Sequence, residues 1–230
     1  MKNGVKTVIV IFIVVGILAL AAVCKKTLNS FDYKDHLDEA VINVDDVSIT
    51  LREFGYYIYD VEAFVQKQAL IYDPQNPKHW WNTHFSAGVD SQFVCDYAKN
   101  VAVNTCILDE IYYKNAVGQG ITVSSLEEEQ ALDDAKDMYD SMNPKQLEAT
   151  GLDMEIIVRM KKKHLLASKY AQYVIENENM SGYADEPEKL VNWDGEYYLN
   201  EILPKHAIQT NDKVMEKITL GKITVNCDLE

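Results

Sequence analysis

The chain has 230 residues, of which 47% are hydrophobic and 25% are charged, a composition typical of a globular protein. Its 36 acidic residues outnumber the 22 basic ones, so the formal net charge at pH 7 is −14. A nucleic-acid-binding protein needs a basic surface that replaces the counterions of the phosphates, and this charge excludes that class. We therefore expect neither nucleic acid nor nucleotide as a ligand.

An uncharged apolar run near the N-terminus covers residues 8–23 and follows two lysines, Lys2 and Lys6. It is shorter than the roughly 20 residues of an ordinary transmembrane helix. Residues 1–26 are therefore expected to be either a signal anchor, kept as a membrane helix, or a signal peptide that is removed.

Two features of this segment keep other processing routes open. Ala19, Leu20 and Ala21 fit the small-x-small site at which a signal peptide is cleaved. Cys24 stands where a bacterial lipoprotein carries its lipid, although Val23 replaces the usual small residue before it. The favoured expectation is a chain held at the cell membrane by its N-terminal segment, with its bulk outside the cytoplasm. A lipoprotein and a secreted protein are the alternatives.

Beyond an acidic linker over residues 27–39, the pattern predicts a mainly α-helical fold with a small β element. Residues 40–50 alternate as two short strands around Asp45 and Asp46. Apolar residues spaced three and four apart, together with capping boxes of the Thr-x-x-Glu type, predict helices in the next segments. These helices are expected over residues 51–72, 90–116, 125–142, 145–150 and 153–178.

A loop and a C-terminal segment complete the organisation. Prolines and a glycine mark residues 73–90 as a loop that is unusually rich in aromatic residues. Residues 40–182 are expected to form the main domain, and residues 183–230 to pack back on its N-terminal strands. Alternation over Ile218–Val225 predicts the strand that makes this contact.

Two sequence patterns resemble a known family. Val41 to Phe54 reads VINVDDVSITLREF, similar to the opening of the N-terminal chaperone domain in SurA-like and PrsA-like extracytoplasmic foldases. Ala116 to Glu127 reads AVGQGITVSSLE, similar to the joint between the second and third helices of that domain. The resemblance implies a SurA N-terminal-like helical chaperone domain that binds unfolded or exported polypeptides.

The chain also departs from this family. Such foldases often carry a parvulin-type prolyl isomerase domain after these helices, with paired histidines. Here His206 is the only histidine after Gly182, so we expect no catalytic residues. The alternatives are a divergent peptidyl-prolyl cis-trans isomerase and a non-catalytic structural partner of a membrane complex.

Clustered aromatic residues are the candidate client-binding residues. Tyr and Trp offer broad apolar faces with a polar tip, which suits contact with varied peptide segments. We expect Tyr56, Tyr59, Trp80 and Trp81 to line one client-facing surface.

The sequence predicts no metal site and no cofactor. His79 and His84 lack the spacing of a helical zinc pair and have no third ligand nearby. Glu127 to Glu129 stand in the first turn of a helix, where acidic residues favour the macrodipole. His164 is interpreted as a histidine of the core or of its rim.

Overall fold

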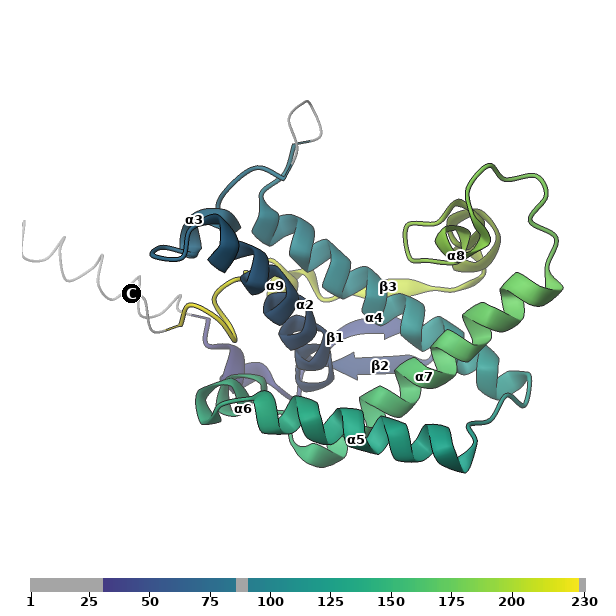
Figure 1. The fold of residues 1–230 in the computed structure, drawn as a ribbon, viewed down its shortest axis with the longest axis horizontal. Coiled ribbons are helices and arrows are strands. Elements are labelled where there is room, and N and C mark those ends of the chain that lie inside the picture. Colours follow the sequence, from purple (N-terminus) through teal and green to yellow (C-terminus); the bar gives the residue numbers. More distant parts are fainter. Residues whose placement is uncertain (1–30, 86–90, 228–230) are drawn as a thin grey trace, which may run out of the picture. The chain divides into compact units, whose positions relative to one another are not determined.

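The structure, a computed structural model, describes residues 31–85 and 91–227 (Figure 1). In these residues helices predominate and a small antiparallel sheet accompanies them, which confirms the predicted fold class at this level. The segment predicted as a signal anchor or signal peptide, residues 1–26, lies outside the described residues, as does the start of the predicted linker.

The predicted linker is partly folded, which corrects the boundary at residue 39. Its second half contains a 3₁₀-helix, η1 (Tyr33–His36). Tyr33 is buried and its hydroxyl donates a hydrogen bond of 2.6 Å to the carbonyl of Leu51. One buried aromatic ring thus joins η1 to the folded unit, a contact that the polar sequence around it does not reveal.

Long helices form most of the unit, and two of them begin at the predicted capping boxes. The hydroxyls of Thr50 and Ser124 each accept the N–H of a glutamate three residues on, and that glutamate accepts the N–H of the cap. The long helices are α2 (Leu51–Tyr72), α4 (Val94–Gly118), α5 (Ser125–Ser141) and α7 (Met154–Asn177). Shorter ones are α3 (Lys78–Trp81), α6 (Pro144–Thr150), α8 (Pro187–Leu190) and α9 (Asp212–Met215).

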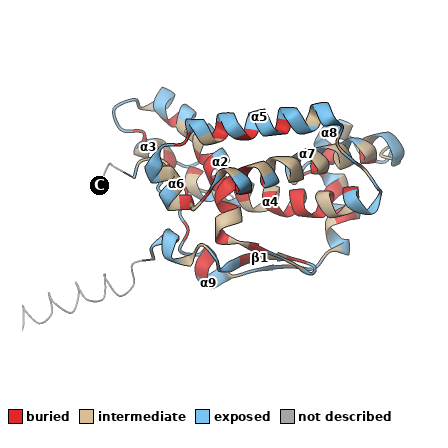
Figure 2. Ribbon diagram, turned by 90° about the horizontal axis from the view of Figure 1, so that it is seen from below, coloured by how far each residue is buried: buried red, intermediate tan, exposed pale blue. Residues whose placement is uncertain are grey.

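The core lies between these helices. α7 packs against α4 and α5, and α2 packs against α4 (Figure 2). The inner faces carry large apolar side chains that are almost fully buried, among them Phe54, Ile58, Ile111, Ile157 and Met160. Burial of such side chains is the main source of stability in a fold of this kind, at about 1.5–3 kcal/mol each.

The sheet has the strand order β2-β1-β3 and is antiparallel throughout. β1 (Ala40–Val44) and β2 (Val47–Thr50) form the predicted hairpin, and Asp45 takes the left-handed conformation that the turn requires, with a φ of 54°. β3 (Ile208–Thr210) comes from the C-terminal segment and pairs with β1. The chain therefore does return to its N-terminal strands, but residues 208–210 make the pairing.

The strand predicted over Ile218–Val225 is not formed, because its backbone bonds to a side chain. Residues 220–225 form turns and bends, and residues 221–224 surround Glu62 of α2, whose side chain is fully buried. Oε1 of Glu62 accepts the backbone N–H groups of Gly221, Lys222 and Ile223. Oε2 accepts both the backbone N–H, at 2.6 Å, and the hydroxyl of Thr224.

The Glu62 carboxylate therefore fixes the end of the described chain to the middle of α2. Burial raises the pKa of Glu62 above its usual value, and the hydrogen bonds from the backbone and from Thr224 oppose that rise. In all five hydrogen bonds an N–H or O–H group donates to an oxygen of Glu62, so residues 221–224 form a binding site for a carboxylate.

Glu62→Gln should destabilise the protein by about 3 kcal/mol or more, because an amide NH₂ would face backbone N–H groups and leave buried donors unsatisfied. Urea unfolding of the full chain followed by circular dichroism measures this loss. Asp60→Asn, an exposed change on the same helix, is the matched control and should shift stability by less than about 0.5 kcal/mol. Equal stability of the Glu62→Gln variant and the wild type would contradict the role of the carboxylate.

Candidate functional site

Three of the four predicted client-binding residues are buried. The exposed fractions are 5% for Tyr56, 9% for Tyr59 and 2% for Trp81. The Tyr59 hydroxyl shares a hydrogen bond of 2.9 Å with the hydroxyl of Ser141. Of the four, only Trp80 is partly exposed, so the expectation that they line one exposed surface is wrong.

Trp81 is buried because the C-terminal segment closes over it. Its indole N–H donates a hydrogen bond of 2.8 Å to the side-chain oxygen of Gln66 on α2. Gln66 in turn exchanges hydrogen bonds with the side chain of Asn226. Gly221 has a φ of +88° and lies against the ring, where an added Cβ would be 2.5 Å from a ring carbon. Trp81 is thus a core residue that the Glu62 contacts help to cover.

Large apolar side chains are instead exposed on the C-terminal half of α2. The exposed fractions are 66% for Phe64, 77% for Ile71 and 58% for Tyr72. Phe64 and Ile71 are seven residues apart and so lie on one side of the helix. The ring of Tyr72 lies 5.0 Å from that of Trp80 on α3. We call Phe64, Ile71, Tyr72 and Trp80 the aromatic tip.

More aromatic pairs follow α3 in the chain. The Phe85 ring stacks on that of Tyr97 at 4.2 Å, and the His84 ring lies 4.4 Å from that of Phe93. Phe85 and Phe93 are 54% and 42% exposed. The richness in aromatic residues of the 73–90 segment was visible in the sequence. Phe64 and Ile71 lie off the helix face that carries Phe54 and Ile58, so the apolar periodicity that predicts a core face did not point to them.

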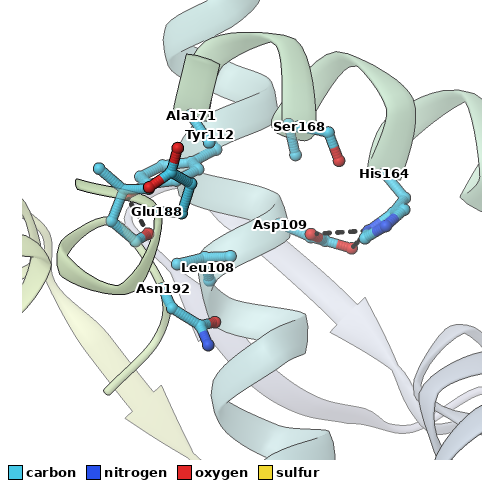
Figure 3. A pocket seen from close by; sticks show the side chains of 10 residues that line it. Leu108, Asp109, Tyr112, His164, Ser168, Ala171, Glu188 and Asn192 are labelled. Atoms are coloured by element: carbon cyan, nitrogen blue, oxygen red, sulfur yellow. Dashed lines mark hydrogen bonds and ion pairs between the residues drawn. The ribbon is translucent and has the colours of Figure 1, made fainter. Parts of the chain in front are cut away.

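A second candidate site surrounds the pair of Asp109 and His164 (Figure 3). A cavity of 160 Å³ is lined by side chains from α4, α7 and the α8 region, with the two residues side by side. Asp109 is buried, and it accepts hydrogen bonds from the Tyr57 hydroxyl at 3.1 Å and from Nδ1 of His164 at 2.9 Å. The carboxylate thereby links α2, α4 and α7.

The electrostatics of this cavity follow from Asp109. Its hydrogen bond and its charge raise the pKa of His164 above the usual 6.5, against the effect of burial. Ser168 follows one helical turn after His164 and also lines the cavity. The cavity volume of 160 Å³ is below the range of ordinary small-molecule sites. The arrangement stabilises the helix packing.

The other residues considered as metal ligands, His79, His84 and Glu127, form hydrogen bonds or ion pairs with nearby side chains. Nδ1 of His79 lies 2.8 Å from a carboxylate oxygen of Asp73, and Nδ1 of His84 lies 2.7 Å from the hydroxyl of Ser91. Glu127 caps its own helix and forms an ion pair of 2.7 Å with Lys169. Within residues 31–85 and 91–227, no three His, Cys, Asp or Glu side chains are grouped so as to hold a metal ion.

Comparisons with known proteins find no match, whether with protein-family models, with curated proteins or with solved structures. Over the part of the chain that the structure describes, none of the helices has both the length and the apolar character needed to cross a membrane.

The His164–Asp109 pair should make stability depend on pH. The folded-state pKa of His164 is raised, so its stabilisation is complete below about pH 6.5 and is lost as the pH rises through the folded-state value. Because His164 is half exposed, we expect an effect of no more than about 1 kcal/mol.

Urea unfolding between pH 5.5 and 8.5 tests this expectation. The stability difference between the wild type and His164→Gln should shrink as the pH rises, and the NMR titration of the His164 ring should have its midpoint above 6.5. A constant stability difference together with a midpoint at or below that value would contradict the proposed effect of Asp109.

Proposed function

We propose that the chain is a non-catalytic, chaperone-like protein that binds unfolded or newly exported polypeptides. Its N-terminal segment would tether it to the cell membrane, with the bulk of the chain outside the cytoplasm. The observation that carries the proposal is the aromatic tip, where Ile71 and Tyr72 are 77% and 58% exposed and the Tyr72 ring lies 5.0 Å from that of Trp80. Grouped exposed apolar side chains of this kind mark interaction surfaces in soluble proteins.

The mechanism would be the reversible burial of apolar client side chains against the aromatic tip. Burial of one large apolar side chain contributes about 2–3 kcal/mol, so a few such contacts are enough for exchangeable binding near micromolar Kd. No nucleotide takes part in this mechanism. The net charge of −14 helps keep the protein soluble despite its exposed apolar surface.

The proposal predicts that the double variant Ile71→Ser, Tyr72→Ser loses most of its ability to suppress aggregation of reduced lysozyme. Both side chains are exposed, so the melting temperature should change by less than about 3 °C. Light scattering measures suppression, and circular dichroism measures melting.

Leu126→Ser is the matched control, because Leu126 is 76% exposed but lies on α5. This variant should suppress aggregation as well as the wild type does. Equal loss in both variants would show a nonspecific effect of surface hydrophobicity. Undiminished suppression by the double variant would exclude the aromatic tip as the client-binding surface. Acceleration of cis/trans exchange in a proline peptide would favour the isomerase alternative.

A further inference from the structure

The outer edge of β3 carries backbone groups that form no hydrogen bond with any described residue. The carbonyl of Ala207 accepts a hydrogen bond of 2.8 Å from the N–H of Asp45, the residue after β1. The N–H of Asn211 donates one of 2.9 Å to the carbonyl of Val41 in β1. The backbone N–H and C=O groups of successive residues in a strand point to alternate sides. Those of Gln209 therefore also face β1, whereas those of Ile208 and Thr210 point away from it. No described residue forms a hydrogen bond with these outward groups, and β3 is therefore an open edge.

A cavity of 350 Å³ adjoins this edge. It lies between α4, the segment after α8 and β3, and its volume is within the range of ordinary ligand sites. Part of its wall is η2 (Tyr198–Ile202), a π-helix, which is a rare conformation that often accompanies functional sites. Its apolar lining consists of Ile107, Trp193, Tyr198, Leu199, Leu203 and Ile208.

We propose that this part of the chain binds an extended polypeptide segment as an added strand. The backbone of the segment pairs with the outward groups of Ile208 and Thr210, and one of its apolar side chains enters the cavity. Strand addition of this kind takes affinity from backbone hydrogen bonds and specificity from side-chain pockets. The inference rests on the proposed function, to which it adds a second site and a preferred class of segment.

The charges around the cavity define that class. Asp194 lies in the lining and is exposed, without an ion pair to a described residue. His206, also in the lining, is already bound through Nδ1 to Asp45 at 2.8 Å. The preferred occupant is therefore an extended segment with a Leu, Met or Phe side chain beside a Lys or Arg. The acidic balance of the whole chain favours the same basic segments.

Amide hydrogen exchange of the full chain, measured by NMR, tests the site directly. The probe is a peptide of alternating Ser and Thr with a central Phe followed by Lys. Saturating peptide should slow exchange at Ile208 and Thr210 by about tenfold or more and leave Gln209 unchanged, because its N–H already faces β1. Peptides with Ser in place of Phe, or Glu in place of Lys, should bind at least about tenfold more weakly.

Thr210→Pro isolates the backbone contribution. It removes an outward N–H, and proline is tolerated on an edge strand where that group faces solvent. Peptide affinity should fall about tenfold. Thr210→Ala is the matched control, since it keeps the N–H and loses only the hydroxyl contact with Asp212. If Thr210→Pro does not fold, N-methylation of the peptide amides that pair with β3 should weaken binding to the wild type equally.

The outcomes separate this inference from the proposed function. Suppression of aggregation that depends on the aromatic tip, with no peptide protection at Ile208 and Thr210, would overturn the added strand and leave the proposed function standing. Protection by peptide without any suppression of aggregation would support the added strand and overturn the proposed function. Protection that appears without peptide and follows dimer formation in sedimentation would assign the edge to a second copy and overturn the inference.

Discussion

The arrangement of the folded unit depends on one buried carboxylate, that of Glu62. A carboxylate in an apolar interior is costly unless several donors surround it, and here four consecutive backbone N–H groups and one hydroxyl do so. The donors belong to residues 221–224, more than 150 positions away in the chain. The interaction therefore fixes a segment without regular secondary structure against the middle of α2.

This attachment covers one side of α2, and the exposed apolar residues lie on another. Because Gly221 lies against Trp81 and Asn226 contacts Gln66, one side of α2 beyond Glu62 is covered. Within the described residues, the side that carries Phe64 and Ile71 is not covered in this way, and these apolar residues are exposed together with Tyr72. Phe64 and Ile71 lie roughly a quarter turn around α2 from Phe54, away from the side that carries Ile58, Glu62 and Ala69 into the core. The contacts with Gly221 and Gln66 bury Trp81, one of the predicted site residues.

The sequence predicted the features that depend on residues close together in the chain. Capping boxes at Thr50 and Ser124 located two long helices, and alternation located the β1–β2 hairpin. It did not predict β3, whose three residues are too few to show a period, nor the role of residues 218–225. There, Ile218 and Leu220 are buried, but in a loop bound to a side chain rather than in a strand. Of the candidate site, the aromatic clustering around Trp80 was visible, whereas the burial of Trp81 depends on the distant Gly221.

Native-state hydrogen exchange of the wild type tests the central role of Glu62 most directly. The amides of Gly221 to Thr224 all donate to its carboxylate, so they should exchange as slowly as the core amides of α2 and α4 and share their dependence on denaturant. Such behaviour would show that the segment is released only when the whole unit unfolds. Fast, denaturant-independent exchange at these four amides, with α2 and α4 still protected, would contradict the account.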